Sequence, residues 1–196
     1  MTSTARAYPD TIIDQLYAEN EALVQYLFTQ AQPTFATTVN ANFRKTLLLA
    51  IASYFEVKVR DDLTAFITDT VGEDHPLLHL AKRKALERQY HTYFNWDGKN
   101  ANAFFALFGE PFKTYMTQKV AADEDLSEAI KAFLELGETR NQIVHQNFAE
   151  FTLEKTPEEI YALYKQARTF VETWPTELRT FTPTLPAAAP RVGEPD

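Results

Sequence analysis

The stretch between Thr37 and Thr70 constrains the fold more than any other part of the sequence, because it contains neither glycine nor proline. Its apolar residues cover most sides of the helix that their spacing predicts; they are Leu47, Leu48, Ala50, Ile51, Tyr54, Phe55 and Val57, followed by Leu63, Phe66 and Ile67. A helix that is apolar on most sides has to be covered by other helices. We therefore expect residues 37–70 to form the central helix of an all-α bundle, either straight or with a bend.

Apolar residues at spacings of three and four predict further helices along the rest of the chain. The first expected helix runs from a cap at Asp10 to about Gln30, before an interruption at Pro33. Shorter helices are expected over 77–90, over 101–108 and from Pro111. Two longer helices are expected, one from about Asp125 into the segment 138–148 and one from Thr156 to about Trp174. A capping box of Thr156 and Glu159, with Pro157 in the first turn, marks the start of the last helix. The chain has only 5 glycines, which leaves few positions for tight turns and favours long helices.

Residues 1–174 are predicted to form one helical domain, and residues 175–196 a separate tail. The tail contains half of the chain's 10 prolines, at positions 175, 183, 186, 190 and 195. Because proline does not continue a helix, we expect the last helix to end near Trp174 and the tail to be extended or disordered. The expected fold is an all-α, up-and-down helical bundle with extra short helices and a proline-rich C-terminal tail.

The composition excludes several classes of site. There is no cysteine, which rules out disulfides, zinc-thiolate sites and thiol nucleophiles. No run approaches the roughly 18 apolar residues of a membrane span, and the first residues lack the apolar core of a secretory signal. We therefore expect a soluble, cytoplasmic protein without a membrane partner. The net charge of −8 works against indiscriminate binding to nucleic acid, so such binding would need a local basic patch or a partner.

Polar residues interrupt the apolar face of the helix expected from Asp125. That face is formed by Leu126, Ile130, Phe133, Leu134, Gly137, Asn141, Val144, His145 and Phe148. Asn141 and His145 are neighbours one turn apart, and the long side chain of Arg140 reaches the same groove. Gly137 on this face permits the close approach of another backbone. A guanidinium, an amide and an imidazole are thus predicted at the end of an apolar seam.

These side chains are suited to cleaving RNA without a metal. An imidazole transfers protons near neutral pH, and a guanidinium binds phosphate and stabilises charge that develops on it. RNA supplies its own nucleophile, the 2′-hydroxyl. One helix offers one histidine, whereas two copies facing each other across a two-fold axis offer two. The alternative is a structural histidine that is hydrogen-bonded at a helix end.

Three blocks of sequence resemble HEPN domains. Residues 140–145, Arg-Asn-Gln-Ile-Val-His, match the R-N-x-x-x-H form of the HEPN motif. Residues 52–56, Ala-Ser-Tyr-Phe-Glu, and residues 100–109, Asn-Ala-Asn-Ala-Phe-Phe-Ala-Leu-Phe-Gly, resemble two further blocks of the RiboL-PSP group and of a second HEPN group. The order and spacing of the blocks agree, and the likeness covers roughly residues 40 to 172.

The resemblance implies a helical bundle that forms a homodimer, with two R-x-x-x-x-H motifs meeting at the interface in a composite active site. It implies a metal-independent ribonuclease that needs no cofactor and acts on RNA in toxin–antitoxin or antiviral defence systems, with an antitoxin or defence protein as partner. Arg140 would bind the scissile phosphate, His145 would act in acid–base catalysis, Asn141 would orient His145 or the substrate, and Glu56 would support the site.

Some features leave open which role the chain would have within such a family. Asn147 stands where related toxins carry the modified tyrosine of an H-x-Y motif, which argues against that form of neutralisation. Some HEPN domains have lost activity and serve as dimerisation or RNA-binding modules, so a silent module is one alternative. A helical adaptor that recruits a partner through the proline-rich tail is another.

Three further groups of residues have both a functional and an ordinary structural interpretation. Lys82, Arg83 and Lys84, with Arg88, would follow an RNA backbone or form a solvated helix face. The aromatic residues Tyr90, Tyr93, Phe94 and Trp96 would stack on bases or pack in the core. Asp74, His75 and His79 have two histidines at metal-ligand spacing but no third obvious ligand, so a surface pair is expected and no metal site is predicted. Glu56 has its own alternative as a structural carboxylate paired with an arginine.

Overall fold

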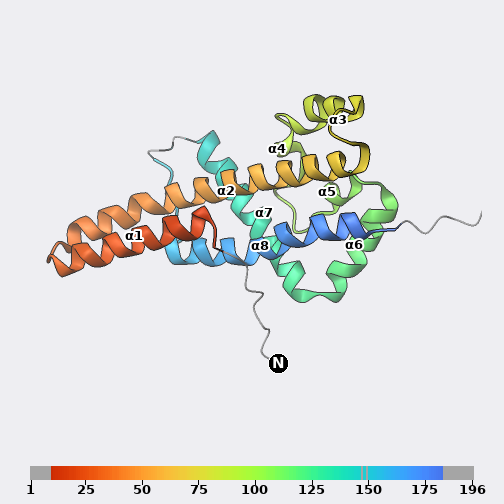
Figure 1. The fold of residues 1–196 in the computed structure, drawn as a ribbon. Helices are drawn as coiled ribbons and strands as arrows, with labels where there is room; N and C mark the ends of the chain where they lie inside the picture. The colour runs from red at the N-terminus through yellow and green to blue at the C-terminus, as the bar shows by residue number, and fades with distance from the viewer. Residues whose placement is uncertain (1–9, 147, 149, 183–196) are drawn as a thin grey trace, which may run out of the picture.

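The structure is a computed structural model that describes residues 10–146, 148 and 150–182. All regular structure within this part of the chain is helical, as predicted. The longest helix, α2 (Pro33–Val71), runs through the molecule, and α1 (Ile12–Thr29) and α8 (Pro157–Thr180) lie along it (Figure 1). The fourth long helix, α7 (Glu124–His145), packs against α8 and α2. The all-α bundle around a central helix is therefore confirmed.

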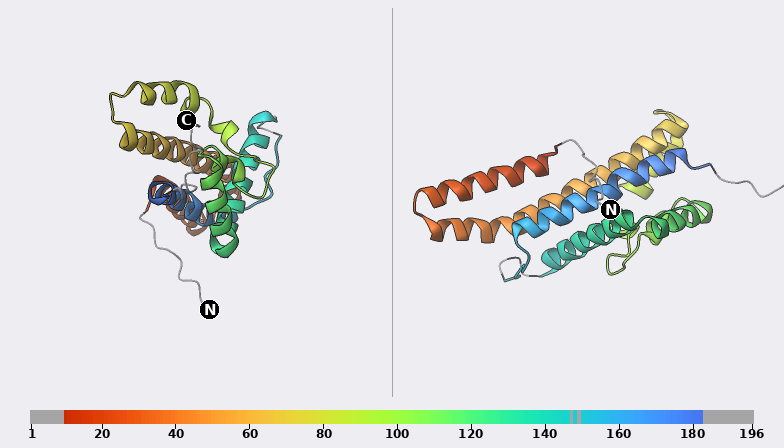
Figure 2. Two further views of the ribbon diagram at one scale, coloured as in Figure 1. Left: turned by 90° about the vertical axis from the view of Figure 1, so that its right-hand side faces the viewer. Right: turned by 90° about the horizontal axis from the view of Figure 1, so that it is seen from below.

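The four long helices alternate in direction along the chain, which confirms the up-and-down arrangement (Figure 2). α1 and the first half of α2 form a hairpin that extends beyond the other helices at one end. The short helices gather around the other end of α2. They are α3 (Pro76–Ala81), the π-helical turn η1 (Lys82–Leu86), α4 (Tyr90–Tyr93), α5 (Asn102–Ala106) and α6 (Glu110–Ala122).

Aromatic side chains join the helices in a continuous core. The rings of Phe55 on α2 and Phe133 on α7 are 5.6 Å apart, and Phe133 lies 5.1 Å from Phe170 on α8. α5 contributes Phe104, whose ring lies 5.0 Å from Trp174 and almost perpendicular to it. Edge-to-face pairs of this kind add to the stabilisation gained from burying the rings. Buried phenylalanines thus connect α7 and α8 to α2 and join the short helix α5 to the same core.

Local capping boxes set the starts of α1 and α8, and the cap of α1 differs from the prediction. The capping box at Thr156 and Glu159 is present as expected, with Pro157 in the first turn. For α1 the predicted cap at Asp10 is wrong, because Thr11 is the N-cap. The Thr11 N–H donates to Asp14 Oδ2 over 2.6 Å, and Thr11 Oγ1 lies 2.5 Å from the hydroxyl of Tyr164. The contact with α8 therefore reinforces the local capping box.

The expected interruption lies at residues 30–32, between α1 and α2, and Pro33 is the first residue of α2. A proline in the first turn loses no helical hydrogen bond, since the N–H groups there have no partner within the helix. From this residue α2 continues unbroken to Val71 and ends at Gly72, whose φ of 91° is readily adopted only by glycine. The long central helix is thus a few residues longer at its start than predicted.

The expected helix over residues 77–90 is wrong beyond Leu86 and is α-helical only to Ala81. The chain widens there into η1, where the Glu87 N–H donates to the Lys82 carbonyl over 2.8 Å. Arg88 then adopts a φ of 60° and turns the chain back toward α4. The hydroxyl of Tyr93 donates to the Ala85 carbonyl over 2.5 Å, and the side chain of Tyr93 is buried. Packing of Tyr93 into the core therefore overrides the local preference for a regular helix.

The predicted end of the last helix near Trp174 is also wrong, because α8 passes through Pro175 and ends at Thr180. Pro175 lacks the N–H that would bond to the preceding turn. Tertiary packing offsets that loss, since Pro175 and Leu178 are buried and the ring of Phe181 lies 5.3 Å from those of Phe112 and Tyr115. The prediction of an extended or disordered tail otherwise falls on residues 183–196, outside the described part of the chain.

Candidate functional site

The residues of the R-N-x-x-x-H motif line a pocket of about 420 Å³ between α2, α4 and the C-terminal part of α7. We call it the α7 pocket. Its lining consists of Ala52, Phe55 and Glu56 from α2, Arg88, Tyr90, His91 and Trp96 from the region around α4, and Phe133, Leu136, Gly137, Arg140, Asn141, Val144 and His145 from α7. A volume in this range suits a small ligand or a single nucleotide unit, and a lining that combines apolar residues with a few polar ones is typical of binding sites.

The last two turns of α7 carry the polar wall of the pocket. Arg140 and Asn141 are half-buried, and Arg140 donates from a terminal nitrogen to Asn141 Oδ1 over 3.2 Å. His145 is the last residue of α7 and is exposed. Its ring makes no hydrogen bond with any other described residue, so it is free to meet a ligand. The alternative of a hydrogen-bonded structural histidine at the helix end does not fit this environment.

Gly137 allows a close approach, although the partner is a side chain and not the expected backbone. A Cβ atom added to Gly137 would stand 2.0 Å from Cζ3 of Trp96. The indole of Trp96 is held in turn by a hydrogen bond from its Nε1 to the His91 carbonyl, over 3.0 Å. The tryptophan therefore closes one side of the α7 pocket because α7 has no side chain at position 137.

Glu56 enters the pocket from α2, one turn after Ala52. It is half-buried, and no ion pair within the described residues involves it, so the alternative of a structural pair with an arginine is not observed. Burial raises the pKa of Tyr90, the nearby charge of Glu56 raises it further, and the charge of Arg140 opposes that rise. The carboxylate, the phenol and the guanidinium thus influence one another within one pocket.

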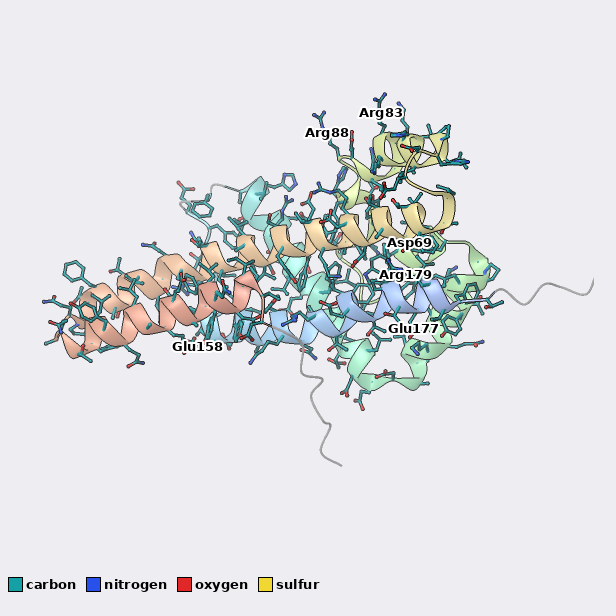
Figure 3. The ribbon with its side chains drawn as sticks, in the orientation of Figure 1. Asp69, Arg83, Arg88, Glu158, Glu177 and Arg179 are labelled. Carbon is teal, nitrogen blue, oxygen red and sulfur yellow. The ribbon has the colours of Figure 1, made fainter. Side chains whose placement is uncertain are left out.

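The predicted basic segment lies beside the pocket and not in it. Lys82, Arg83 and Lys84 belong to η1, and the last two are exposed. Arg88, from the turn after η1, is exposed and reaches the rim of the pocket. Figure 3 shows Arg83 and Arg88 pointing outward on the same side, away from the helices beneath them. Exposed cations of η1 and of the turn after it therefore lie on one side of the molecule, and Arg88 among them belongs to the pocket lining.

The predicted aromatic group divides between the core and the pocket. Tyr93 and Phe94 are each only 5% exposed and pack in the core. Tyr90 and Trp96 line the pocket, with their ring centroids 5.5 Å apart. Of the four residues considered for stacking on bases, only these two remain in a position to do so.

The histidine pair at 75 and 79 lies at α3, away from the pocket. His75 is the N-cap of α3 and its Nδ1 accepts the Leu77 N–H over 3.2 Å, which is a structural role. No cluster of three or more potential metal ligands occurs among the residues that the structure describes. Asn147, the residue that replaces the modified tyrosine of related toxins, lies outside the described part of the chain.

His91 is a pocket residue that the sequence did not reveal. It follows Arg88 by three positions, and the turn between η1 and α4 brings both residues to the pocket lining. The prediction of a continuous helix over 77–90 obscured that turn. The one sequence signal that could have identified His91 is its position three residues after an arginine and next to an aromatic cluster.

Comparison with known families identifies the family of the chain. The model of the RiboL-PSP-HEPN family matches residues 14–178. The chain belongs to the RiboL-PSP-HEPN family. HEPN domains are often ribonucleases, and they commonly bind RNA and dimerise. No curated protein matched the sequence, and no solved structure matched it either.

The three HEPN-like blocks differ in what they do in this fold. The block at 52–56 places Glu56 in the α7 pocket, whereas Ser53 faces a separate groove between α1 and α2. The block at 100–109 is structural, since Phe104 and Phe105 are buried beneath α8.

No described helix combines the length and the apolar character that a membrane crossing requires.

Proposed function

We propose that this HEPN protein is a metal-independent endoribonuclease that cleaves RNA through attack of the 2′-hydroxyl on the neighbouring phosphate. The observation that carries the proposal is that Arg140, Asn141, His145 and Glu56 all line one open pocket. Residues far apart in sequence meet in this pocket. The net charge of −8 disfavours a general affinity for RNA, so binding needs a local site.

The proposed roles follow from the chemistry of each group. Arg140 binds the scissile phosphate and stabilises the charge that develops on it in the transition state. The exposed imidazole of His145 transfers a proton. Asn141 accepts a hydrogen bond from Arg140, which favours a role in orienting the guanidinium. Glu56, on α2, supports the site by adding a carboxylate to the pocket that Arg140 also lines.

The cations outside the pocket extend the proposed binding surface. Lys82, Arg83 and Lys84 carry positive charge next to the pocket, and none of them joins an ion pair within the described residues. Contacts of this kind bind phosphates without regard to sequence and weaken as salt rises. We therefore assign the η1 segment to the RNA backbone on one side of the cleaved bond.

The proposed assembly is a homodimer in which the C-terminal ends of α7 meet. Val144, which also lines the pocket, is 53% exposed although it is apolar, and it would be covered in such an interface. The two pockets would then open onto a shared, composite cleft. The proposed setting is a cytoplasmic toxin–antitoxin or antiviral defence system, in which an antitoxin or defence protein controls the enzyme.

The experiment that tests this function compares purified wild type with Arg140→Ala and His145→Ala on mixed RNA in excess chelator. Wild type should cleave, and each substitution should lower kcat/KM by about 100-fold or more, the usual contribution of a proton-transfer or anion-binding group. His79→Ala is the matched control, since His79 is an exposed histidine outside the pocket. RNA that stays intact with wild type, while the three variants bind it equally, would favour a silent RNA-binding module.

A further inference from the structure

α1 carries two neighbouring rows of side chains, and in each row the residues are three and four positions apart, so that they share one face of the helix. One row packs against the bundle, since Tyr17 stacks on Tyr161 of α8 with the ring centroids 4.0 Å apart. The second row consists of Ile12, Leu16, Glu19, Leu23 and Tyr26. Ile12, Leu23 and Tyr26 are 64%, 45% and 59% exposed. A row of exposed apolar side chains along one helix marks a surface for a partner.

The second row borders a groove between α1 and α2, which lie side by side (Figure 1). The groove has a volume of about 430 Å³, and its lining consists of Ile12, Ile13, Gln15, Leu16 and Glu19 from α1 and Ala50, Ser53, Tyr54 and Val57 from α2. We call it the α1–α2 groove. Ala50, Ser53 and Val57 also lie three and four positions apart, and the first two are small. Two rows with a hollow between them form the kind of surface on which a third helix packs in a bundle.

The charge around the α1–α2 groove is negative. Glu19 is the one charged residue of its described lining; it is exposed, and no ion pair within the described residues involves it. The sequence has no lysine, arginine or histidine between Arg6 and Arg44, whereas the same stretch contains Asp10, Asp14, Glu19 and Glu21. An apolar surface with charge of one sign favours a partner of the opposite sign.

Two other occupants fit this surface less well. RNA is a polyanion, which the carboxylates of α1 repel. A second copy of α1, packed antiparallel across a two-fold axis, would bring Glu19, the middle residue of the row, next to the partner subunit's Glu19. Like charges oppose such a contact.

We propose that the α1–α2 groove binds an amphipathic, basic helix of another protein. The apolar side chains of that helix, at heptad spacing, pack against Ile12, Leu16 and Val57, and one of its lysines or arginines pairs with Glu19. The groove shares no lining residue with the α7 pocket. Docking therefore does not use the residues proposed for cleavage, and the inference does not depend on the proposed ribonuclease function.

The probe for this site is a synthetic amphipathic peptide with leucines at the a and d positions of its heptads and lysines at the flanking e and g positions. A second peptide carries glutamates in place of the lysines. Calorimetric titration of the full chain, without RNA, should give a dissociation constant at least about 10-fold lower for the lysine peptide than for the glutamate peptide. No binding of the lysine peptide, or equal affinity for both peptides, would overturn the proposal.

The apolar contacts are tested by Ile12→Gln combined with Val57→Gln, which adds no charge. This variant should bind the lysine peptide about 10-fold more weakly or worse, because two exposed apolar side chains no longer become buried. Leu77→Gln combined with Leu80→Gln is the matched control, since these residues of α3 are 54% and 57% exposed and lie outside the groove. Equal weakening in both double variants would contradict docking in the groove.

The charge is tested by Glu19→Lys, which should reduce the preference for the lysine peptide about 10-fold. Glu73→Lys changes the net charge by the same amount at an exposed residue outside the groove and should leave the preference unchanged. Equal effects of the two variants would mean that the peptide responds only to the net charge, which would overturn the pairing with Glu19. Thermal unfolding of each variant verifies that its fold is retained.

A spin label locates the bound peptide. Because the chain has no cysteine, Ser53→Cys introduces a single thiol that carries a nitroxide in the groove. The lysine peptide should immobilise this nitroxide and leave one at Ala103→Cys, an exposed position on α5, unchanged. Immobilisation at both positions or at neither would overturn the proposal. A wild-type dimer that dissociates in the Ile12→Gln and Val57→Gln variant, while neither peptide binds, would assign the groove to a second copy instead.

Discussion

Gly137 lies so close to the ring of Trp96 that any side chain there forces a shift. The Cβ of an alanine would stand 2.0 Å from Cζ3 and 2.2 Å from Cε3 of the indole. The ring has little freedom to retreat, because it also packs 5.0 Å from Phe94 and 5.8 Å from Phe133. A single absent side chain on α7 thus sets the shape of the pocket wall.

Gly137→Ala is expected to lower the free energy of unfolding by about 1–3 kcal/mol, the usual cost of overpacking. In the background of Trp96→Ala the sign should reverse, because alanine stabilises a helix by about 1 kcal/mol relative to glycine once the clash is removed. Chemical denaturation of the four proteins of this double-mutant cycle measures both effects. Destabilisation of equal size in the two backgrounds would contradict a direct contact between the two residues.

The residues of the motif could be predicted because their geometry is local. Arg140, Asn141 and His145 lie on one helix, so the helical period alone brings them together. Arg88 and His91 could not be predicted in the same way. Their position depends on a π-helical turn and a left-handed residue that the long-range burial of Tyr93 stabilises.

A polar network between α1 and α8 fixes the packing of these two helices. Asp14 accepts hydrogen bonds from the hydroxyl of Tyr161 over 2.8 Å and from the Thr11 N–H over 2.6 Å, and Arg168 lies 3.4 Å away. Burial alone would raise the pKa of Asp14. The hydrogen bonds from Tyr161 and Thr11, together with the charge of Arg168, outweigh burial and hold the pKa below its ordinary value of 3.8.

The network predicts how stability depends on pH. A carboxyl group whose pKa is lowered by folding stabilises the fold above its unfolded pKa, and this contribution is lost as pH falls through the folded value. Asp14→Asn should therefore lower the free energy of unfolding by about 1–3 kcal/mol at neutral pH. Below pH 3.8 its stability should fall less steeply with acid than that of wild type.

Denaturant unfolding between pH 2 and pH 7 checks this expectation. Asp61→Asn is the matched control, since Asp61 is an exposed residue of α2 outside any ion pair within the described residues. If the free energy of unfolding falls equally steeply with acid in wild type and in Asp14→Asn, the ionisation of Asp14 does not contribute to the pH dependence of stability.

At the scale of elements, the sequence predicted the long helices better than their ends. The capping box at Thr156 and Glu159 is a local signal and was found correctly. Thr11 was missed in favour of Asp10, because the choice between two adjacent capping residues depends on a contact with Tyr164 on α8. The passage of α8 through Pro175 likewise depends on tertiary packing.

The whole molecule is expected to be a dimer that meets at the ends of α7. Val144→Glu places a charge on an apolar residue of this surface and should raise the dimer dissociation constant at least about 10-fold, since burial of an unpaired charge is costly. Leu107→Glu is the control, because Leu107 is also an exposed apolar residue, 56% exposed against 53% for Val144, but lies outside the pocket.

Sedimentation equilibrium over a range of concentrations measures both variants and wild type. A wild type that is monomeric at micromolar concentration, or a Val144→Glu variant that dimerises normally, would contradict this interface. Loss of the dimer in both variants would point to a different surface.

The most direct test of the central claim replaces one atom of the substrate. An RNA oligonucleotide with a mapped cleavage site is compared with the same oligonucleotide carrying a single 2′-deoxy sugar at that nucleotide. If the RNA's own 2′-hydroxyl attacks in the α7 pocket, the all-ribose substrate gives a 2′,3′-cyclic phosphate and the substituted one binds but is not cut there. Cleavage at the 2′-deoxy nucleotide, or a product that ends in a 3′-hydroxyl, would contradict the proposed chemistry.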